Sequence, residues 1–255
     1  LRQERARQIS PMKRQFLIAY EDPLMLAVVK PAGLLVHGDQ TEKKNTLVNQ
    51  VTGYLMEQGE YQPGREKTFT PAAVNRLDRN TSGLVLFGKT SGAVQSLNQM
   101  IRERGYLDKY YLAIVWGELD HTLHLKSRME KDQEKNRIAV LEEGAGEGKL
   151  METIARPLSV RQGFTQVEVE LITGRTHQIR AHLADAGYPI IGDEKYGDRG
   201  RNKLLAERFG LTSQFLHASR IRFQDALPPV AHLAGLEITA PLPRRLEKIK
   251  QELSL

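Results

Sequence analysis

Residues 75–83 hold the densest group of reactive side chains in this 255-residue chain. Arg76, Asp78 and Arg79 stand within four residues of one another, between two apolar stretches. Burial beside apolar strands raises the pKa of a carboxyl group, whereas a nearby arginine lowers that pKa and keeps the group ionised. An ionised carboxylate can act as a nucleophile or a base. Asp78 is therefore a candidate catalytic residue, and the competing interpretation is a solvated polar turn.

A second reactive segment, residues 174–182, reads Gly-Arg-Thr-His-Gln-Ile-Arg-Ala-His. It follows an alternating strand and opens a helix, so cationic side chains and free backbone N–H groups gather at one end. Arg180 lies away from the apolar stripe of this helix, and a surface helix with scattered cations is the competing interpretation. Tyr111, in the apolar strand 109–116, is a third candidate, for which core packing is the ordinary role.

Other common catalytic patterns do not fit the sequence. The glycine-rich run 144–149 lacks the spacing of a phosphate-binding loop and precedes a strand, so we predict a hairpin loop there. His177 and His182 would point about 140° apart on a helix, which does not suit a shared metal ion. Ser82 lacks a neighbouring base. The chain has no cysteine, which excludes disulfides, thiolate metal sites and a cysteine nucleophile. We therefore expect neither a metal nor a nucleotide cofactor.

The net charge of +6 comes from the two ends of the chain. Residues 1–14 hold five basic residues and one acidic residue, and residues 241–255 hold four basic and two acidic residues. The body between them is formally neutral, so charge alone favours a polyanionic partner only modestly. A composition of 40% hydrophobic and 27% charged residues is typical of a globular protein. We predict a basic N-terminal arm or linker remnant over residues 1–14 and a single catalytic domain over residues 15–255.

Targeting signals are not apparent in the sequence. No stretch approaches the roughly 20 apolar residues of a membrane helix, and the N-terminal residues lack the apolar core of a secretory signal. Together with the lack of cysteine, this leads us to expect a cytoplasmic protein that does not associate with a membrane.

Hydrophobic periodicity and turn residues predict the elements that position the reactive segments. Helices are predicted over residues 46–58, 91–104, 176–186 and 241–253. Strands are predicted over residues 16–20, 24–30, 72–74, 84–87, 109–116, 118–125, 137–141, 150–160, 164–172, 215–223 and 236–240. Because the strands arrive in hairpin-like runs with helices between the clusters, we predict an α+β fold with a mixed, mainly antiparallel sheet flanked by helices.

Together these segments resemble the motifs of the RluA family of RNA pseudouridine synthases. The catalytic motif of that family, His-Arg-Leu-Asp-x-x-Thr-Ser-Gly, is similar to residues 75–83, with Asn75 in place of the histidine. The Lys-x-Tyr-x-Ala strand of the family matches residues 109–113, and its Gly-Arg-Thr-His-Gln-Ile-Arg-x-His motif matches residues 174–182 throughout. Further similar segments are residues 30–33, 36–37, 187–193, 195–197 and 216–218. The resemblance runs from about Phe16 to the last helix.

The resemblance implies the pseudouridine synthase fold, with a central catalytic cleft, and an isomerase that needs no cofactor. In this reaction the bond from ribose C1′ to uracil N1 breaks and a bond from C1′ to C5 forms. Asp78 would be the essential carboxylate, which either attacks C1′ or removes a proton from C2′; both mechanisms remain open. Arg180 would pair with Asp78 and keep it ionised. Tyr111 would stack under the target base and is a candidate for removing the C5 proton.

The same resemblance implies the substrate contacts. Arg76 would enter the RNA in place of the extruded base, and Leu216 would line the base pocket. The other residues expected to bind substrate are Arg79, Thr81, Gly83, Arg175, His177 and Gln178. Phosphate contacts are expected from Arg79, Arg175, Lys195, Arg199, Arg201 and Lys203. Asn75 does not put the activity in doubt, because the family's chemistry does not depend on the histidine, but local hydrogen bonding would differ.

The function predicted from these residues is isomerisation of uridines in structured RNA, most of all large-subunit ribosomal RNA, by a monomeric enzyme. A tRNA pseudouridine synthase is the alternative within the same class. An RNA-binding or ribosome-assembly protein without catalysis is an alternative of another class, and intact Asp78, Tyr111 and Arg180 argue against it. A glycoside hydrolase would need a second carboxylate, which neither segment offers. Some family members carry an RNA-binding S4 domain before the catalytic domain, and residues 1–14 could be the remnant of a linker after such a domain.

Overall fold

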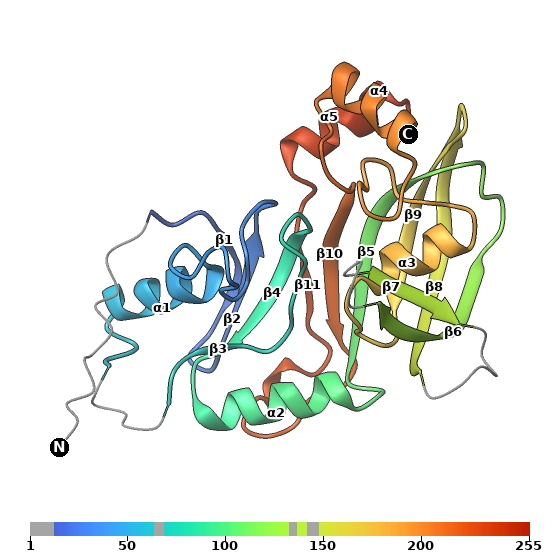
Figure 1. Ribbon diagram of the computed structural model, residues 1–255. Helices are drawn as coiled ribbons and strands as arrows, with labels where there is room; N and C mark the ends of the chain where they lie inside the picture. Colours follow the sequence, from blue (N-terminus) through green and yellow to red (C-terminus); the bar gives the residue numbers. More distant parts are fainter. Residues whose placement is uncertain (1–12, 64–68, 133–136, 142–147) are drawn as a thin grey trace. The chain divides into compact units, whose positions relative to one another are not determined.

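The computed structural model describes residues 13–63, 69–132, 137–141 and 148–255, with the side chains of residues 131 and 132 left aside (Figure 1). Most of the predicted basic arm, residues 1–12, and most of the predicted glycine-rich loop, residues 144–147, lie outside the described residues. The chain divides into two compact units. The first unit comprises residues up to Arg79 together with Gly83–Leu107 and Arg222–Thr239. The second unit comprises Asn80–Ser82, Asp108–Ile221 and Ala240–Leu255.

The first unit is built on a small antiparallel sheet. Strands β1 (Leu17–Glu21) and β2 (Met25–Lys30) form a hairpin, and β4 (Ser82–Gly88) pairs with the other edge of β2. The short strand β3 (Ala72–Ala73) also pairs with β4. The hairpin turn is fixed by the Asp22 carboxylate, which accepts hydrogen bonds from the backbone N–H groups of Leu24 and Met25 at 2.7 and 2.8 Å. The predicted strands 16–20, 24–30, 72–74 and 84–87 are confirmed within one or two residues.

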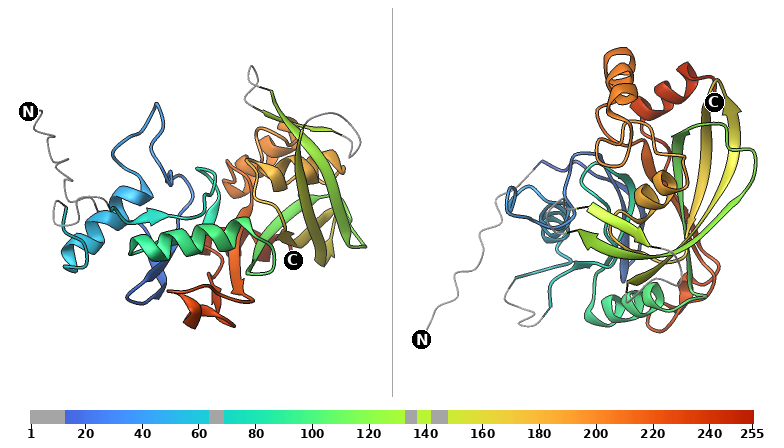
Figure 2. Two further views of the ribbon diagram at one scale, coloured as in Figure 1. Left: turned by 90° about the horizontal axis from the view of Figure 1, so that it is seen from below. Right: turned by 45° about the vertical axis from the view of Figure 1, so that its right-hand side comes forward.

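Two capped helices complete most of the first unit (Figures 1 and 2). Helix α1 (Leu47–Glu57) begins after Thr46, and α2 (Ser91–Arg102) begins after Thr90; each threonine side chain accepts a hydrogen bond from a backbone N–H of the first turn. Helix α2 approaches β4 so closely that a Cβ on Gly88 would lie 2.5 Å from the Val94 side chain. The short helix η1 (Ala231–Leu233) and strand β11 (Glu237–Thr239) end the unit.

The second unit is built on a larger antiparallel sheet (Figure 1). Its strands lie in the order β5 (Leu107–Trp116), β9 (Phe164–Leu171), β8 (Lys149–Arg161), β6 (Leu123–Asp132) and β7 (Arg137–Leu141). Strand β10 (Leu216–Phe223) lies on the other side of β5. The alternating pattern of β9 predicted its inward face correctly, because Val167 and Val169 are fully buried.

Three helices belong to the second unit. Helix α3 (Gln178–Asp185) packs on the sheet through Ala181, which joins a buried cluster with Met129 of β6, Ile138 of β7 and Met151 of β8. Helices α4 (Arg199–Phe209) and α5 (Arg244–Glu252) lie side by side (Figure 1), and the Arg245 guanidinium donates a hydrogen bond to the Gly210 carbonyl at the end of α4. The described elements therefore have the predicted α+β composition, with mainly antiparallel pairing.

One predicted strand is wrong in its position, and one helix was missed. The strand expected over residues 118–125 begins only at Leu123, because the Thr165 hydroxyl donates to the Gly117 carbonyl and accepts from the Leu119 N–H, which holds a turn there. Helix α4 was not predicted at all. No described helix is long and apolar enough to cross a membrane.

Candidate active site

The predicted catalytic segment, residues 75–79, forms the loop between β3 and β4 in the first unit. Leu77 is buried and anchors the loop, whereas Arg76 and Arg79 are exposed. The side chain of Asp78 is half-buried between these extremes. The loop therefore presents a partly desolvated carboxylate between two exposed cations, as the sequence predicted.

The fully buried side chain of Lys30 holds this loop in place. The Lys30 ammonium donates to the carbonyl oxygens of Pro31, Leu34 and Arg79 at 2.9, 2.7 and 2.9 Å. Burial lowers the pKa of Lys30 to about 7, whereas the negative charge of Asp78 raises it. Sequence reasoning noted residues 30–33 only as a similar segment and missed this role.

Asn75 replaces the family's histidine at the start of the loop. Its amide nitrogen donates to the Leu84 carbonyl at 3.2 Å, and its amide oxygen accepts from the Leu86 N–H at 2.8 Å. The side chain thus binds two backbone groups of β4 and ties the loop to that strand. The expected difference from the hydrogen bonding of the family's histidine stays a prediction.

The exposed arginines of the loop lie near residues 37–42. Burial lowers the pKa of His37, and the charge of Arg76 lowers it further. The pKa of Asp39 is lowered mainly by a hydrogen bond from the Thr41 side chain, with a smaller effect from the charge of Arg79. The segment after Lys30 therefore lies beside both arginines and shares their electrostatic environment.

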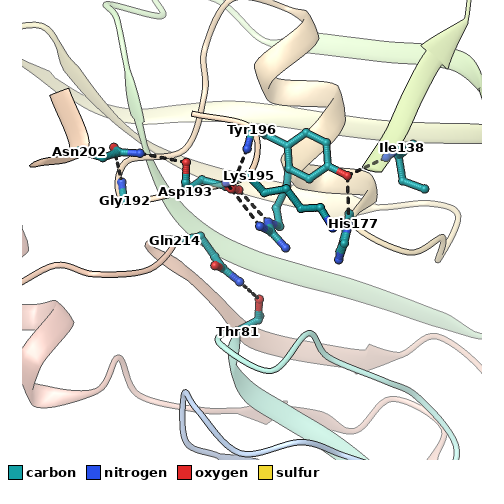
Figure 3. Close-up of polar contacts among 10 residues, drawn as sticks. Thr81, Ile138, His177, Gly192, Asp193, Lys195, Tyr196, Asn202 and Gln214 are labelled. Atoms are coloured by element: carbon teal, nitrogen blue, oxygen red, sulfur yellow. Dashed lines mark hydrogen bonds and ion pairs between the residues drawn. The ribbon is translucent and has the colours of Figure 1, made fainter. Parts of the chain in front are cut away.

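The residues that follow the loop make internal contacts in the second unit. Thr81 is buried, and its hydroxyl accepts a hydrogen bond from the Gln214 amide at 3.2 Å (Figure 3). Nε2 of His217 lies 3.0 Å from the Ala240 carbonyl and must donate, so Nδ1 accepts from the Ser82 hydroxyl at 2.8 Å. The expectation that Ser82 has no neighbouring base is therefore wrong, because His217 lies 135 residues further along the chain. These contacts give Thr81 a structural role. Contact of Thr81 and Gly83 with RNA stays a prediction.

Arg180 is buried in α3 and forms a two-pronged ion pair with Asp193. Nε lies 2.7 Å from Oδ2 and Nη2 lies 2.9 Å from Oδ1, and the carboxylate is fully buried. Burial would raise the pKa of Asp193, but the hydrogen bonds and charge of Arg180 hold it below its ordinary value. This geometry fixes the plane of the guanidinium. The pairing of Arg180 with Asp78 stays a prediction.

Asp193 also organises the turn after it (Figure 3). Its carboxylate accepts from the backbone N–H groups of Lys195 and Tyr196 at 2.9 and 3.0 Å, and its carbonyl accepts from the Asn202 amide at 2.9 Å. A Cβ on Gly197 would lie 2.5 Å from the same carbonyl, so the turn requires glycine there. Sequence reasoning quoted Asp193 in a motif but assigned it no role.

His177 and Tyr196 meet at the start of α3. His177 precedes the helix in a left-handed conformation with φ of 53°, and its Nδ1 lies 3.0 Å from the Tyr196 hydroxyl. That hydroxyl accepts from the Ile138 N–H at 2.9 Å, which leaves its hydrogen for His177 (Figure 3). The carbon of the Arg180 guanidinium lies 5.2 Å from the centre of the Tyr196 ring, a cation–π contact.

Gln178 fixes the loop before α3 rather than facing solvent. It is 2% exposed, and its amide nitrogen donates to the Glu152 carbonyl and the Thr153 hydroxyl at 2.9 Å each. Its amide oxygen accepts from the Thr173 hydroxyl and the Arg175 N–H. Arg175 itself is exposed. RNA contact stays a prediction for Arg175, His177 and Gln178.

Tyr111 lies on the face of the sheet that α3 covers. Tyr111 stands opposite Val169 on β9. Two residues further along β9, Leu171 stands opposite Thr153 on β8. Because side chains two apart on a strand share a face, Tyr111 and Thr153 share one, and α3 bonds to Thr153 through Gln178. The structure thus brings Tyr111 and the Arg180 helix to one face of the second unit. Leu216 is buried at the start of β10.

His182 is an internal residue of α3. Its two ring nitrogens lie 2.7 and 2.9 Å from the hydroxyls of Ser127 and Thr153, and burial lowers its pKa to about 4. The ring therefore stays neutral in the folded protein at pH 7. Through these two contacts the ring joins α3 to β6 and β8.

Acid is expected to destabilise the protein partly through His182. Between pH 6.5 and about 4 the unfolded chain binds a proton at this ring that the folded chain excludes, so the stability falls as the pH falls. The slope from this group is at most about 1.4 kcal/mol per pH unit. Urea unfolding at pH 7, 6 and 5 should show a smaller slope for His182→Gln. Leu204→Gln, an exposed change on α4 that removes no titratable group, is the control and should keep the wild-type slope. Equal slopes for His182→Gln and wild type would contradict this assignment.

Comparison with known proteins shows the family of this chain. The family model for RNA pseudouridylate synthase matches residues 25–185. Ribosomal large subunit pseudouridine synthase C of Vibrio vulnificus (strain CMCP6) is 36% identical over 239 residues, which cover 94% of this chain and 70% of that protein. The protein of that name from Escherichia coli (strain K12) is 35% identical over 242 residues, covering 93% and 70%.

Solved structures show the same fold. The human RNA pseudouridylate synthase domain containing 4 superposes with a TM-score of 0.71 at 22% identity, covering 93% of this chain and 92% of that one. The human RNA pseudouridylate synthase domain containing 1 gives 0.68 at 20% identity, covering 94% and 95%. The fold of both units is thus that of a pseudouridine synthase, and the sequence matches show that the chain belongs to the RNA pseudouridylate synthase family.

Proposed function

We propose that this protein isomerises uridines of large-subunit ribosomal RNA to pseudouridine. The observation that carries the proposal is sequence identity of 35–36% to large-subunit pseudouridine synthases over more than nine-tenths of the chain, with Asp78, Tyr111 and Arg180 all present. We further propose that the enzyme acts as a monomer in the cytoplasm. The single catalytic domain over residues 15–255 and its central cleft stay predictions.

In the proposed mechanism Asp78 acts on the ribose of the target uridine. The bond from C1′ to N1 breaks, the uracil turns within the site, and C1′ joins C5. C5 then loses its proton and N1 gains one, so the product is an isomer of the substrate. Asp78 acts as a nucleophile at C1′ or as a base at C2′, and both need the carboxylate to be ionised. Within the same unit the negative charge of Asp78 raises the pKa of Lys30, so the two groups interact.

The other residues of the proposed site hold the substrate. Tyr111 stacks under the base, Leu216 lines its pocket, and Arg180 pairs with Asp78 while Asp193 fixes the guanidinium. Arg76 takes the place of the extruded base, which fits its exposure at the centre of the loop. Phosphates are expected to contact exposed cations, among them Arg79 and Arg175.

The substrate class can be tested by mapping pseudouridines. Unmodified transcripts of large-subunit ribosomal RNA and bulk unmodified tRNA are incubated with the protein, labelled with a carbodiimide that marks pseudouridine, and read by primer extension. We expect new stops at discrete uridines of the ribosomal RNA and none in the tRNA. Stops in tRNA alone would contradict the proposed substrate, and stops in neither RNA would contradict the proposed activity of this chain.

A further inference from the structure

Three lysines are buried among the described residues, and they differ in the partners of their ammonium groups. Lys30 donates to three carbonyl oxygens. Lys89 pairs with Glu21 and Glu60 and donates to the Asp22 carbonyl. Lys109 is only 9% exposed, yet within the described residues its ammonium has no hydrogen bond or ion pair. The ammonium nitrogen itself keeps some contact with solvent, because it is not among the fully buried side-chain atoms that lack a partner, so an anionic ligand can reach it and supply that partner.

The position of Lys109 indicates where that ligand lies. Lys109 precedes Tyr111 by two residues on β5, so both side chains stand on the sheet face that α3 covers. A Cβ added to Gly174 would lie 3.7 Å from the Lys109 ammonium nitrogen. The ammonium is therefore beneath the exposed loop that leads into α3.

This loop has other features of an anion site. Residues 174–176 are exposed, and they include the cationic side chain of Arg175. Helix α3 starts a few residues after Gly174, and the residue that precedes it, His177, supplies no side-chain cap. The N-terminus of a helix carries partial positive charge and attracts anions. A buried ammonium, an exposed guanidinium and a helix N-terminus thus lie at one end of the α3 face.

We propose that Lys109 binds a phosphodiester group next to the target uridine. This inference rests on the proposed function, since it takes RNA as the ligand. A phosphodiester is ionised at every working pH, so its single charge matches one ammonium in the ground state, whereas a uracil carbonyl is neutral until the glycosidic bond breaks. Burial lowers the pKa of Lys109, and a bound phosphate would favour its charged form again.

The first test compares Lys109→Met with wild type. Methionine has a similar length and removes a buried charge, so the variant should fold with at least wild-type stability in urea. We expect the Kd and KM for a substrate RNA to rise about tenfold to hundredfold, with kcat changed less than threefold. The slope of log Kd against log salt should fall by roughly 0.7 to 0.9. Lys248→Met, which removes an exposed charge of α5, is the matched control and should leave kcat and KM within twofold.

The second test locates the phosphate. A neutral methylphosphonate replaces, in turn, the phosphodiester on the 5′ and on the 3′ side of the mapped uridine. At one of the two positions it should weaken wild-type binding by the same factor as Lys109→Met and weaken binding of the variant no further. Equal weakening of both proteins at both positions would overturn the proposal.

The outcomes separate this inference from the proposed function. If Lys109→Met has the same Kd, KM and salt slope as the wild type, the inference is overturned. Pseudouridine formation by the wild type would still uphold the proposed function in that case. A fall in kcat alone would also overturn it, because it would assign Lys109 to the uracil anion rather than to a phosphate. Absence of pseudouridine formation by the wild type would instead contradict the function.

Discussion

Asp78→Asn is expected to reduce pseudouridine formation by roughly 10⁴-fold or more, as loss of a nucleophile does in other enzymes. Asparagine keeps the shape of the half-buried side chain, but its amide can neither attack C1′ nor accept a proton from C2′. RNA affinity should stay within a few fold of wild type, because this carboxylate carries no attraction for phosphates. Single-turnover assays at saturating enzyme measure the rate of pseudouridine formation, and a separate binding assay measures the Kd for RNA.

Asp225→Asn is a suitable control for this change. Asp225 is an exposed carboxylate of the same unit, and its replacement should leave the single-turnover rate within twofold. Substantial turnover by Asp78→Asn would show that the carboxylate of Asp78 is not essential for the reaction. A large loss of affinity in a folded Asp78→Asn protein would show that the residue acts in binding instead.

Asp193→Ala should produce the largest combined loss of stability and activity. It leaves Arg180 buried without the carboxylate that accepts two of its hydrogen bonds, and breaking a buried ion pair costs about 3–5 kcal/mol. Without this anchor the guanidinium plane is free to rotate, so kcat should fall by about a hundredfold or more. Urea unfolding and steady-state kinetics on the same preparation measure both effects.

Asp193→Asn distinguishes positioning from stability alone. The side-chain oxygen can still accept from the N–H groups of Lys195 and Tyr196, so the turn should persist while the charge at Arg180 is lost. We expect a lower kcat with KM changed less than threefold. Glu168→Gln, which breaks the half-exposed pair with Arg220, should cost at most about 1 kcal/mol and leave kcat intact. An Asp193→Asn protein with wild-type kcat would limit Asp193 to folding.

Local sequence signals predicted much of the fold. Helix α1 was expected over residues 46–58 and is observed over Leu47–Glu57, because Thr46 caps an apolar stripe of helical spacing. Helix α4 was missed because it contains Gly200 and has no continuous apolar stripe. Its only clear signals are the Asp198 cap at its start and Gly210, with φ of 66°, at its end.

Contacts between residues far apart in the chain could not be predicted from the sequence. The motifs predicted Asp78, Tyr111 and Arg180 as site residues, because reactive residue types stand there in a family pattern, and their catalytic roles stay predictions. The pairing of Arg180 with Asp193 depends on how the turn after Ile191 folds against α3, and no local pattern states it. The same holds for Lys30, whose three carbonyl partners come from two segments, the more distant of them 49 residues along the chain.

Release of tritium from RNA labelled at uridine C5 tests the central claim most directly, because isomerisation must remove that hydrogen. The wild-type protein is incubated with labelled, unmodified large-subunit ribosomal RNA and, separately, with labelled bulk tRNA. We predict release from the ribosomal RNA in proportion to the pseudouridine formed. Binding of the ribosomal RNA without release of tritium from either RNA would contradict the account and indicate an RNA-binding protein without catalysis.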